Sequence, residues 1–372
     1  MTDFHDALER VIHEIVAPQA TTVDTTGTFP ADAIAALGTA GLLGLTAAES
    51  DGGGGQGLRQ AAEVVQSLAG PCGSTAMVVL MHYAGAVVIH NHGPAEVRAA
   101  LAAGRHLTTL AFSEKGSRSH FWAPRSSATA EGGAVRLDAD KSWVTSAGQA
   151  DSYVWSSRPL AADGPMSLWL VPATTPGLRP VGAFDGFGLR GNQSIPVEGR
   201  DVRVPATALL GADGAGLDVA LAEILPWFLV LSAAFSVGLM EAVTAETGEH
   251  LRTTRLEHLD EALIGVAGNR ADHARMRLAT DQAAALLADT LAALEAGRAD
   301  TMLRVLEVKA AAAEAAIAVT DLAMKLCGGA AFRKEVGIER RFRDARAARV
   351  MAPTTDALLD FVGRAINGLP LL

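Results

Sequence analysis

The hydrophobic pattern of this chain changes period twice, and this order of segments restricts the fold more than any single motif. Residues 1–108 carry apolar side chains near helical spacing, as at Ile34 and Leu37. Residues 108–210 instead hold short alternating runs between glycines and prolines, which is typical of strands. From Leu217 onward the helical spacing returns. The sequence therefore predicts a mostly α fold with a central β domain.

Turn signals and segment lengths make this prediction more specific. In the middle segment, residues 127–131 and 134–140 flank a Gly-Gly turn as the two strands of a hairpin. Several short strands within about a hundred residues favour a small barrel or sandwich. The long helical stretches that follow favour a four-helix bundle, with a helix stop at Gly328-Gly329. We predict an N-terminal helical domain over residues 1–108, a β domain over 109–212 and a C-terminal bundle over 213–372.

Composition argues against several classes of partner. The chain has 372 residues and a net charge of −10 at pH 7, which disfavours binding to a phosphate backbone. Cys72 and Cys327 are far apart in no metal-ligand spacing, and His90 with His92 is too sparse for a metal site. The acidic N-terminus lacks a signal-peptide pattern. We therefore expect no nucleic-acid partner, no metal and a reducing cytoplasmic location.

Residues 224–240 form a run without a charged side chain. A membrane span needs about 20 apolar residues, and this run is shorter and contains Pro226. Glu223 and Glu241 close it without a basic flank. Because a helix that is apolar on every side belongs in a protein core, we predict a buried helix and no membrane association.

Five stretches follow one another along essentially the whole chain: residues 41–53, 110–120, 141–147, 189–191 with 201–205, and 325–356. Taken together, they resemble acyl-CoA dehydrogenases. In the third, Lys141-Ser-Trp143-Val-Thr145 is similar to the Lys-x-Trp-Ile-Thr pattern of that family. The resemblance implies an N-terminal helical domain, a β domain and a helical bundle. It also implies FAD as cofactor.

The resemblance assigns flavin contacts in the β domain. Trp143 is expected to pack on the flavin ring system, and Thr145 to bond its polar edge. Ser113, on the neighbouring strand, is expected to do the same, and Ser119 to reach the pyrophosphate. A flat apolar wall with donors or acceptors at one edge is what an isoalloxazine needs. Read alone, Trp143 would be an ordinary core aromatic, and the family pattern favours the flavin role.

Further flavin contacts are implied in the bundle. The residues are Arg252 or Arg255, Lys325, Gly328, Gly329, Thr354 and Asp356. Lys325 occupies the place of a family glutamine, where a cation can pair with phosphate oxygens as a point charge. In the family, the adenosine half of FAD usually lies against a neighbouring subunit. We therefore expect a homodimer or homotetramer, or a heteromer with a paralogue.

The chain departs from the family at its catalytic base. Ala352 stands where the family usually has the glutamate that removes the α-proton of an acyl thioester. Some members carry that glutamate on the first bundle helix, where this chain has Phe228. A methyl group and a phenyl ring cannot accept a proton, so Phe228 and Ala352 are expected only to line the substrate pocket. Pro353 also replaces a glycine and stiffens the same turn.

Three residues are candidates for a replacement base. Glu241 lies one turn beyond the uncharged run and is more readily interpreted as solvent-exposed. His82 lies in an apolar helical run, and His120 ends the loop on the flavin side. A single histidine in such places is more often a packed, hydrogen-bonded residue than a base. The catalytic residue is therefore left open.

Three functions fit these observations. The first is α,β-dehydrogenation of an acyl-CoA or related substrate, with a displaced or absent base and an electron-transfer flavoprotein as acceptor. The second is a flavin-dependent monooxygenase or oxidase of the same fold, which takes reduced flavin from a reductase and needs no such base. The third is a non-catalytic subunit of a heteromeric acyl-CoA dehydrogenase. We favour the first, and composition does not separate them.

Overall fold

The computed structural model describes residues 4–117, 120–334 and 336–371 and contains two compact units. The first unit comprises Met1–Val64, Met77–Asp185 and Arg190–Phe228, and the second comprises Val65–Ala76, Gly186–Leu189 and Leu229–Leu372. Three helices, α4, α5 and α8, contribute residues to both units. Each unit has its own buried apolar core.

Helices form the N-terminal part of the chain. They are α1 (Phe4–Val11), α2 (Ala17–Thr26), α3 (Ala31–Thr39), α4 (Leu58–Ala69), α5 (Gly73–His92) and α6 (Ala95–Ala102), and a π-helical turn over Ile12–Val16 joins the first two. Gly27 adopts a left-handed conformation, with φ at 67°, and ends α2. Pro30 then precedes α3, where a missing N–H costs nothing. Local turn chemistry therefore sets the spacing of these helices.

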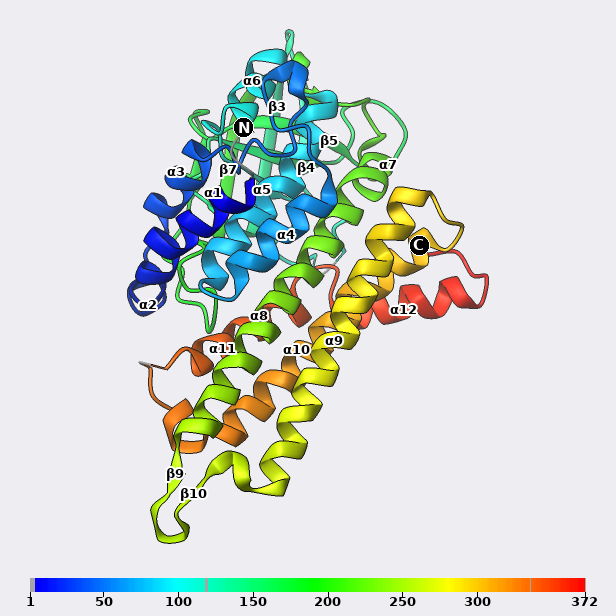
Figure 1. Ribbon diagram of the computed structural model, residues 1–372. Helices are drawn as coiled ribbons and strands as arrows, with labels where there is room; N and C mark the ends of the chain where they lie inside the picture. Colours follow the sequence, from blue (N-terminus) through cyan, green and yellow to red (C-terminus); the bar gives the residue numbers. More distant parts are fainter. Residues whose placement is uncertain (1–3, 118–119, 335, 372) are drawn as a thin grey trace. The chain divides into compact units, whose positions relative to one another are not determined.

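The strands form two four-stranded sheets (Figure 1). The strands are β1 (Thr108–Ala111), β2 (Ser127–Glu131), β3 (Ala134–Val144), β4 (Ser152–Ser157), β5 (Ser167–Pro172), β6 (Leu178–Pro180), β7 (Ile195–Pro205) and β8 (Leu209–Leu210). One sheet has the order β1-β4-β5-β8 and the other β2-β3-β7-β6. The hairpin β2–β3 follows the predicted Gly-Gly turn, with Glu131 opposite Ala134. The outcome is a sandwich, so the barrel alternative was wrong.

Aromatic side chains fill the space between the two sheets. Trp155 on β4 lies directly opposite Trp169 on β5, and both are fully buried. Gly199 on β7 approaches the Trp155 ring so closely that an added Cβ would lie 3.2 Å from it. The core of the β domain is therefore built on one pair of indoles.

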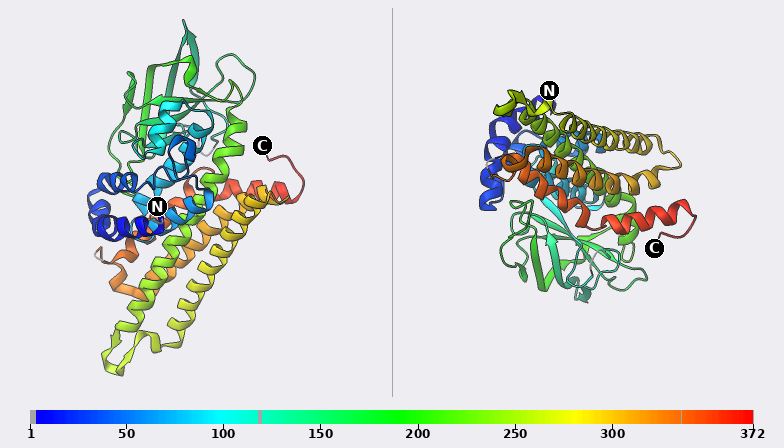
Figure 2. Two further views of the ribbon diagram at one scale, coloured as in Figure 1. Left: turned by 45° about the horizontal axis from the view of Figure 1, so that its top comes forward. Right: turned by 90° about the horizontal axis from the view of Figure 1, so that it is seen from below.

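The second unit contains long helices (Figures 1 and 2). They are α8 (Leu225–Thr253), α9 (Ala267–Ala296), α10 (Thr301–Ala331), α11 (Gly337–Val350) and α12 (Thr355–Ile366), preceded in the chain by α7 (Gly216–Val219) and a π-helical turn over Ala220–Ile224. A short hairpin of β9 (Arg255–Leu256) and β10 (Glu261–Ala262) separates α8 from α9. Helix α10 packs against α9, α11 and α12. The predicted helical bundle is confirmed.

The uncharged run lies in and just before α8, and its residues are buried. Leu229, Leu231 and Phe235 are fully inaccessible to solvent. Two stretches of the described chain, Gly73–His92 and Gly216–Thr253, are long and apolar enough to cross a membrane by length and composition. Their most apolar windows are 89% and 72% buried inside the protein. Both are therefore explained as core helices.

Close packing of α8 against the end of α4 gives a first prediction. A Cβ at Gly238 would lie 1.9 Å from the backbone oxygen of Gln66, so Gly238→Ala forces the two helices apart. We expect a loss of about 1–3 kcal/mol in unfolding free energy, measured by urea denaturation. Gly363→Ala in α12 is the matched control, because nothing lies within 4 Å of its added Cβ. We expect it to stabilise by about 0.5–1 kcal/mol, and equal effects of the two variants would refute this account.

Candidate functional site

A buried ion pair lies beneath the loop that joins β1 to β2. Lys141 on β3 is only 1% exposed, and its Nζ donates to Glu114 Oε1 at 2.7 Å. The same ammonium donates to the carbonyl and hydroxyl oxygens of Ser156 on β4, at 2.7 and 2.9 Å. It also lies 5.1 Å above the centre of the Trp155 ring. One side chain therefore connects the two sheets and the loop.

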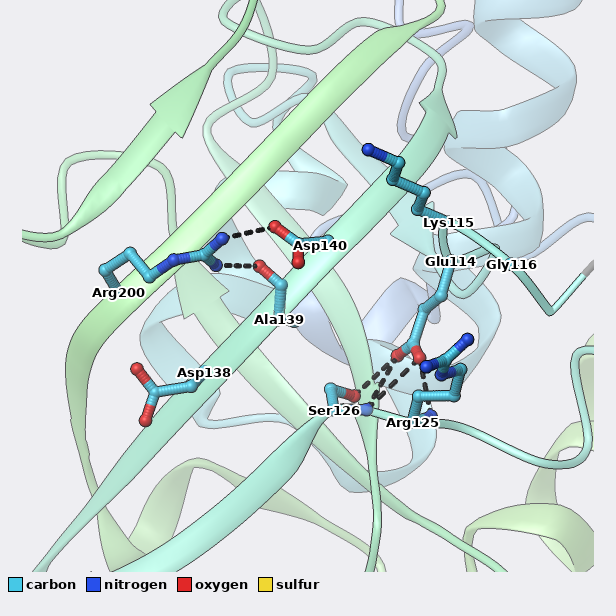
Figure 3. Close-up of a pocket in the computed structure, with 9 residues that line it drawn as sticks. All are labelled: Glu114, Lys115, Gly116, Arg125, Ser126, Asp138, Ala139, Asp140 and Arg200. Carbon is cyan, nitrogen blue, oxygen red and sulfur yellow. Dashed lines mark hydrogen bonds and ion pairs between the residues drawn. The ribbon is translucent and has the colours of Figure 1, made fainter.

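Glu114 is fixed from its other side as well (Figure 3). Its carboxylate accepts from the backbone N–H of Arg125 at 2.5 Å and from the hydroxyl of Ser126 at 2.6 Å. Burial raises its pKa, but Lys141 and these donors outweigh that effect and lower the pKa overall. Burial also lowers the pKa of Lys141 to about 8. Both groups are therefore ionised at neutral pH.

An open pocket of about 630 Å³ lies beside Glu114 (Figure 3). Its lining is polar and consists of Glu114, Lys115, Gly116, Arg125, Ser126, Asp138, Ala139, Asp140 and Arg200. Arg200 is already paired with Asp140 at 2.5 Å across the two strands. Ser113, Trp143 and Thr145 are not among these lining residues. Within the first unit, the pocket is therefore separate from the predicted flavin contacts.

Trp143 projects from the end of β3 into solvent. The pairing of β3 with β7 shifts register between Lys141 and Val144, and Trp143 has a positive φ of 55°. An irregularity of this kind turns a side chain away from the direction that a regular strand would give it. The indole is 71% exposed, the opposite of an ordinary core aromatic. This strand end therefore presents a flat apolar surface.

Polar groups lie beside Trp143 on the same unit. The backbone N–H of Ser142 donates to the carbonyl of Ser113 at 2.8 Å, so Ser113 lies alongside this strand. The hydroxyls of Thr145 and Ser194 are 3.0 Å apart. The Ser146 hydroxyl is buried and has no hydrogen-bond partner among the described residues. Ser113, Trp143 and Thr145 thus share one edge, while Ser119 lies outside the described residues.

The predicted phosphate-binding cations of the second unit each have an acidic partner. Arg252 donates to Glu249 at 2.8 Å and Arg255 to Asp260 at 2.5 Å. Lys325 donates to Asp272 at 2.6 Å. All three cationic side chains are more than half exposed; the carboxylates paired with Arg252 and Arg255 are exposed too, so these two pairs add little stability, whereas Asp272 beside Lys325 is buried. They therefore remain candidates for contact with a phosphate.

The remaining predicted contacts lie at helix ends of the second unit. Gly328 has a non-helical backbone, with φ 52° and ψ −132°, and it kinks α10 three residues before that helix ends at Ala331. Thr354 caps the N-terminus of α12, where its hydroxyl accepts from the N–H of Ala357 at 3.3 Å. Asp356 is exposed in the first turn, and the buried Thr355 hydroxyl has no partner among the described residues. A helix N-terminus is a favourable place for an electron-rich ligand group.

Three domain descriptions match the chain in succession. They are the N-terminal, middle and C-terminal domains of acyl-CoA dehydrogenase, which match residues 2–104, 109–202 and 214–367. The chain belongs to the acyl-CoA dehydrogenase family. The predicted resemblance and the assignment to oxidoreductase flavoproteins are thereby confirmed.

Individual acyl-CoA dehydrogenase relatives extend over nearly the whole chain. The mitochondrial short-chain specific acyl-CoA dehydrogenase of Homo sapiens is 28% identical and covers 91% of this chain and 83% of its own. FkbI, a protein for biosynthesis of the methoxymalonyl extender unit of the polyketide Fk520, is 26% identical, with a TM-score of 0.86 over 98% of this chain and 99% of its own. Butyryl-CoA dehydrogenase from Megasphaera elsdenii shares the fold at 22% identity, with a TM-score of 0.91 over 99% of both chains.

Phe228 and Ala352, which the family resemblance aligns with the base positions, lie in different units and are both apolar. Phe228, at the end of the first unit, is 8% exposed. Ala352 is partly exposed in the turn between α11 and α12 of the second unit. Neither side chain has an ionisable group, so neither accepts a proton.

The replacement candidates differ in how far their polar atoms are already engaged. His82 is fully buried between Leu43 O, 3.0 Å from Nε2, and the N–H of Thr108, 3.3 Å from Nδ1, and burial lowers its pKa to about 4. With Nδ1 accepting, Nε2 must donate, so His82 is a neutral packing residue in this structure. This environment does not favour a base role.

Glu241 and His120 are exposed. Both carboxylate oxygens of Glu241 accept from the side-chain amide of Gln66, at 3.1 and 3.0 Å, which agrees with the solvent-exposed interpretation. His120 Nδ1 lies 3.1 Å from Ser117 O, and its ring meets the Trp122 ring edge-on at 4.9 Å. Because both side chains are exposed, neither lies in a closed cavity of the described residues.

The Glu114–Lys141 pair was not predicted, although both residues lie inside recognised motifs. The spacing of the two charges, 27 residues apart, carries no signal in the sequence. The one clue is that Lys141 follows Val135, Leu137 and Ala139 at every second position of an alternating strand, because an inward position forces a lysine to find a partner. Only the sandwich shows that the partner is Glu114.

Removing the ammonium of this pair tests its role. We expect Lys141→Met to lower the unfolding free energy by about 3–5 kcal/mol, because Glu114 would keep a buried charge without its cation. Adding Glu114→Gln should recover part of the loss. Arg200→Met is the matched control, since its pair with Asp140 is more than half exposed and should be worth less than about 1 kcal/mol. Similar losses in chemical denaturation for Lys141→Met and Arg200→Met would contradict this assignment.

Proposed function

We propose that this chain is an FAD-dependent oxidoreductase acting on an acyl thioester, by α,β-dehydrogenation of an acyl-CoA or a related substrate. The observation that supports it most is the exposed indole of Trp143, held at a strand irregularity inside a family motif. Single exposed apolar side chains are common on protein surfaces, so this indole carries weight because it lies inside the family motif. The family match over all three domains supplies the chemistry.

Each unit carries residues that the family resemblance assigns to a flavin. On the first, Trp143 offers an apolar face, Ser113 lies beside its strand, and the hydroxyl of the buried Thr145 meets that of Ser194. On the second, Thr354 and Asp356 lie at the N-terminus of α12, and Arg252, Arg255 and Lys325 are exposed cations. Bound FAD would accept the hydride that leaves the β carbon. The protein would orient the thioester and exclude water.

The base is the open part of the reaction. With alanine and phenylalanine at the family positions, the α-proton must pass to a displaced group or to water. This favours a slow dehydrogenase, and it also suits a monooxygenase or oxidase, which needs no α-proton base. A non-catalytic subunit beside a base-bearing paralogue is the third arrangement. Oxygen uptake with reduced flavin would identify the monooxygenase or oxidase. Recovery of activity on co-expression with a paralogue would identify the non-catalytic subunit.

We further propose a cytoplasmic homodimer or homotetramer, in which exposed cations of one subunit contact the FAD of another. Electrons would pass to an electron-transfer flavoprotein, or arrive from a flavin reductase if the monooxygenase alternative holds. Sedimentation of the flavin-loaded protein tests the first statement. A monomer with full flavin affinity would contradict it.

Flavin affinity provides a direct test of the Trp143 assignment. We expect Trp143→Ala to raise the dissociation constant of FAD roughly tenfold, because a ring-sized contact is lost. The measurement is quenching of flavin fluorescence on titration with apoprotein. Phe187→Ala is the matched control, since Phe187 is a similarly exposed aromatic, at 63%, without an assigned flavin role. If both variants bind FAD like the parent protein, Trp143 is not a flavin contact.

Restoring a carboxylate tests the reaction. We expect Ala352→Glu to speed bleaching of the bound flavin by a short panel of acyl-CoAs under anaerobic conditions by roughly 100-fold, which is within the usual contribution of a general base. Ala352→Gln is the control, because it matches the glutamate in size and cannot accept the proton. If no acyl-CoA reduces the flavin of either variant, the dehydrogenase proposal is wrong, although the flavoprotein assignment stands.

A further inference from the structure

A second buried lysine lies under the turn that carries Ala352. Lys309 on α10 is 1% exposed. Its Nζ donates to three backbone carbonyls, those of Ala348 at 2.9 Å, Met351 at 3.0 Å and Pro353 at 2.8 Å. No carboxylate of residues 4–117, 120–334 or 336–371 is recorded as an ion-pair partner of this ammonium. Its charge is therefore compensated by peptide dipoles.

The three acceptors lie where the chain leaves one helix and enters the next. Ala348 is in the last turn of α11, where carbonyl groups lack intrahelical donors. Met351 and Pro353 lie on either side of Ala352, and Thr354 follows directly as the N-cap of α12. An ammonium has three N–H groups, so it satisfies all three carbonyls at once. A cation at this end of α11 is also favoured by the helix dipole.

We propose that Lys309 is a positioning residue, which fixes the turn of residues 351–354 and so places Ala352 and the flavin-directed Thr354. This role rests in part on the proposed function, because Thr354 is assigned to flavin by the family resemblance. The geometric part does not depend on it. The turn has few anchors of its own: Ala352 brings a single methyl group, and Pro353 lacks an N–H. The hydrogen bonds from the Lys309 ammonium hold the turn in place.

The geometry distinguishes this role from that of a base. Burial lowers the pKa of Lys309 to about 7, within reach of neutral pH. However, deprotonation would leave one of the three carbonyls without a donor, and the side chain has almost no access to solvent. Lys309 therefore acts on the turn through hydrogen bonds, and a substrate proton does not reach it.

Hydrogen exchange of the full chain tests the geometric part without any cofactor. We expect Lys309→Met, which keeps the length and loses the donors, to speed amide exchange in peptides covering residues 349–358 by about tenfold. Peptides of β3, in the other unit, should stay unchanged. Arg304→Met, on the same helix but in a partly exposed ion-pair network, is the control and should leave residues 349–358 unchanged. Unchanged exchange in Lys309→Met, or an equal rise throughout the second unit, would overturn the proposal.

Flavin binding tests the functional part. We expect Lys309→Met to raise the FAD dissociation constant roughly tenfold, and Lys309→Arg to recover part of it, because a guanidinium also donates to several carbonyls. If Lys309→Met does not fold, Lys309→Arg is measured in its place. For this variant we expect a smaller rise in amide exchange over residues 349–358. If the parent protein binds no FAD, the proposed function is refuted. The hydrogen-exchange result still tests whether Lys309 fixes the turn. Fast local exchange with unchanged FAD affinity would overturn the link between the turn and the cofactor.

Discussion

The ammonium of Lys141 is the interaction on which the β domain depends. Buried charges are costly unless every proton finds an acceptor, and here Glu114 and Ser156 supply them from a loop and from the other sheet. The pair therefore joins the two sheets and the loop at a single point. Trp143 follows two residues later, at the irregularity that turns its indole outward. The buried pair thus lies close in the chain to the strand end that presents the exposed indole.

The second unit uses a related device in different surroundings. Among the described residues, Lys309 has no carboxylate as ion-pair partner. Its ammonium donates instead to three carbonyl oxygens at and just beyond the end of α11. The first lysine joins strands, whereas the second holds a turn between helices. In both cases a long side chain reaches out from a regular element to an irregular segment. Irregular segments lack a repeating hydrogen-bond pattern of their own, so they depend on such donors.

The family fold of this chain and its proposed reaction depend on different residues. The family fold, the exposed indole and the cap of α12 are all present. Residues 228 and 352, at which the family resemblance places the base, are phenylalanine and alanine, and both ring nitrogens of His82 are engaged by backbone groups. Flavin binding and proton removal are separate requirements.

The sequence by itself determined the fold class and the family, and it places an alanine at residue 352. These follow from local periodicity and from motifs that lie within short stretches, which need no knowledge of distant contacts. It did not determine that Trp143 is exposed, that Glu114 meets Lys141, or that Lys309 lies under Met351 and Pro353. Each of these joins residues far apart in the chain or depends on an irregular backbone. Only the tertiary structure decides such contacts, because burial and hydrogen-bond geometry arise when separate elements pack together.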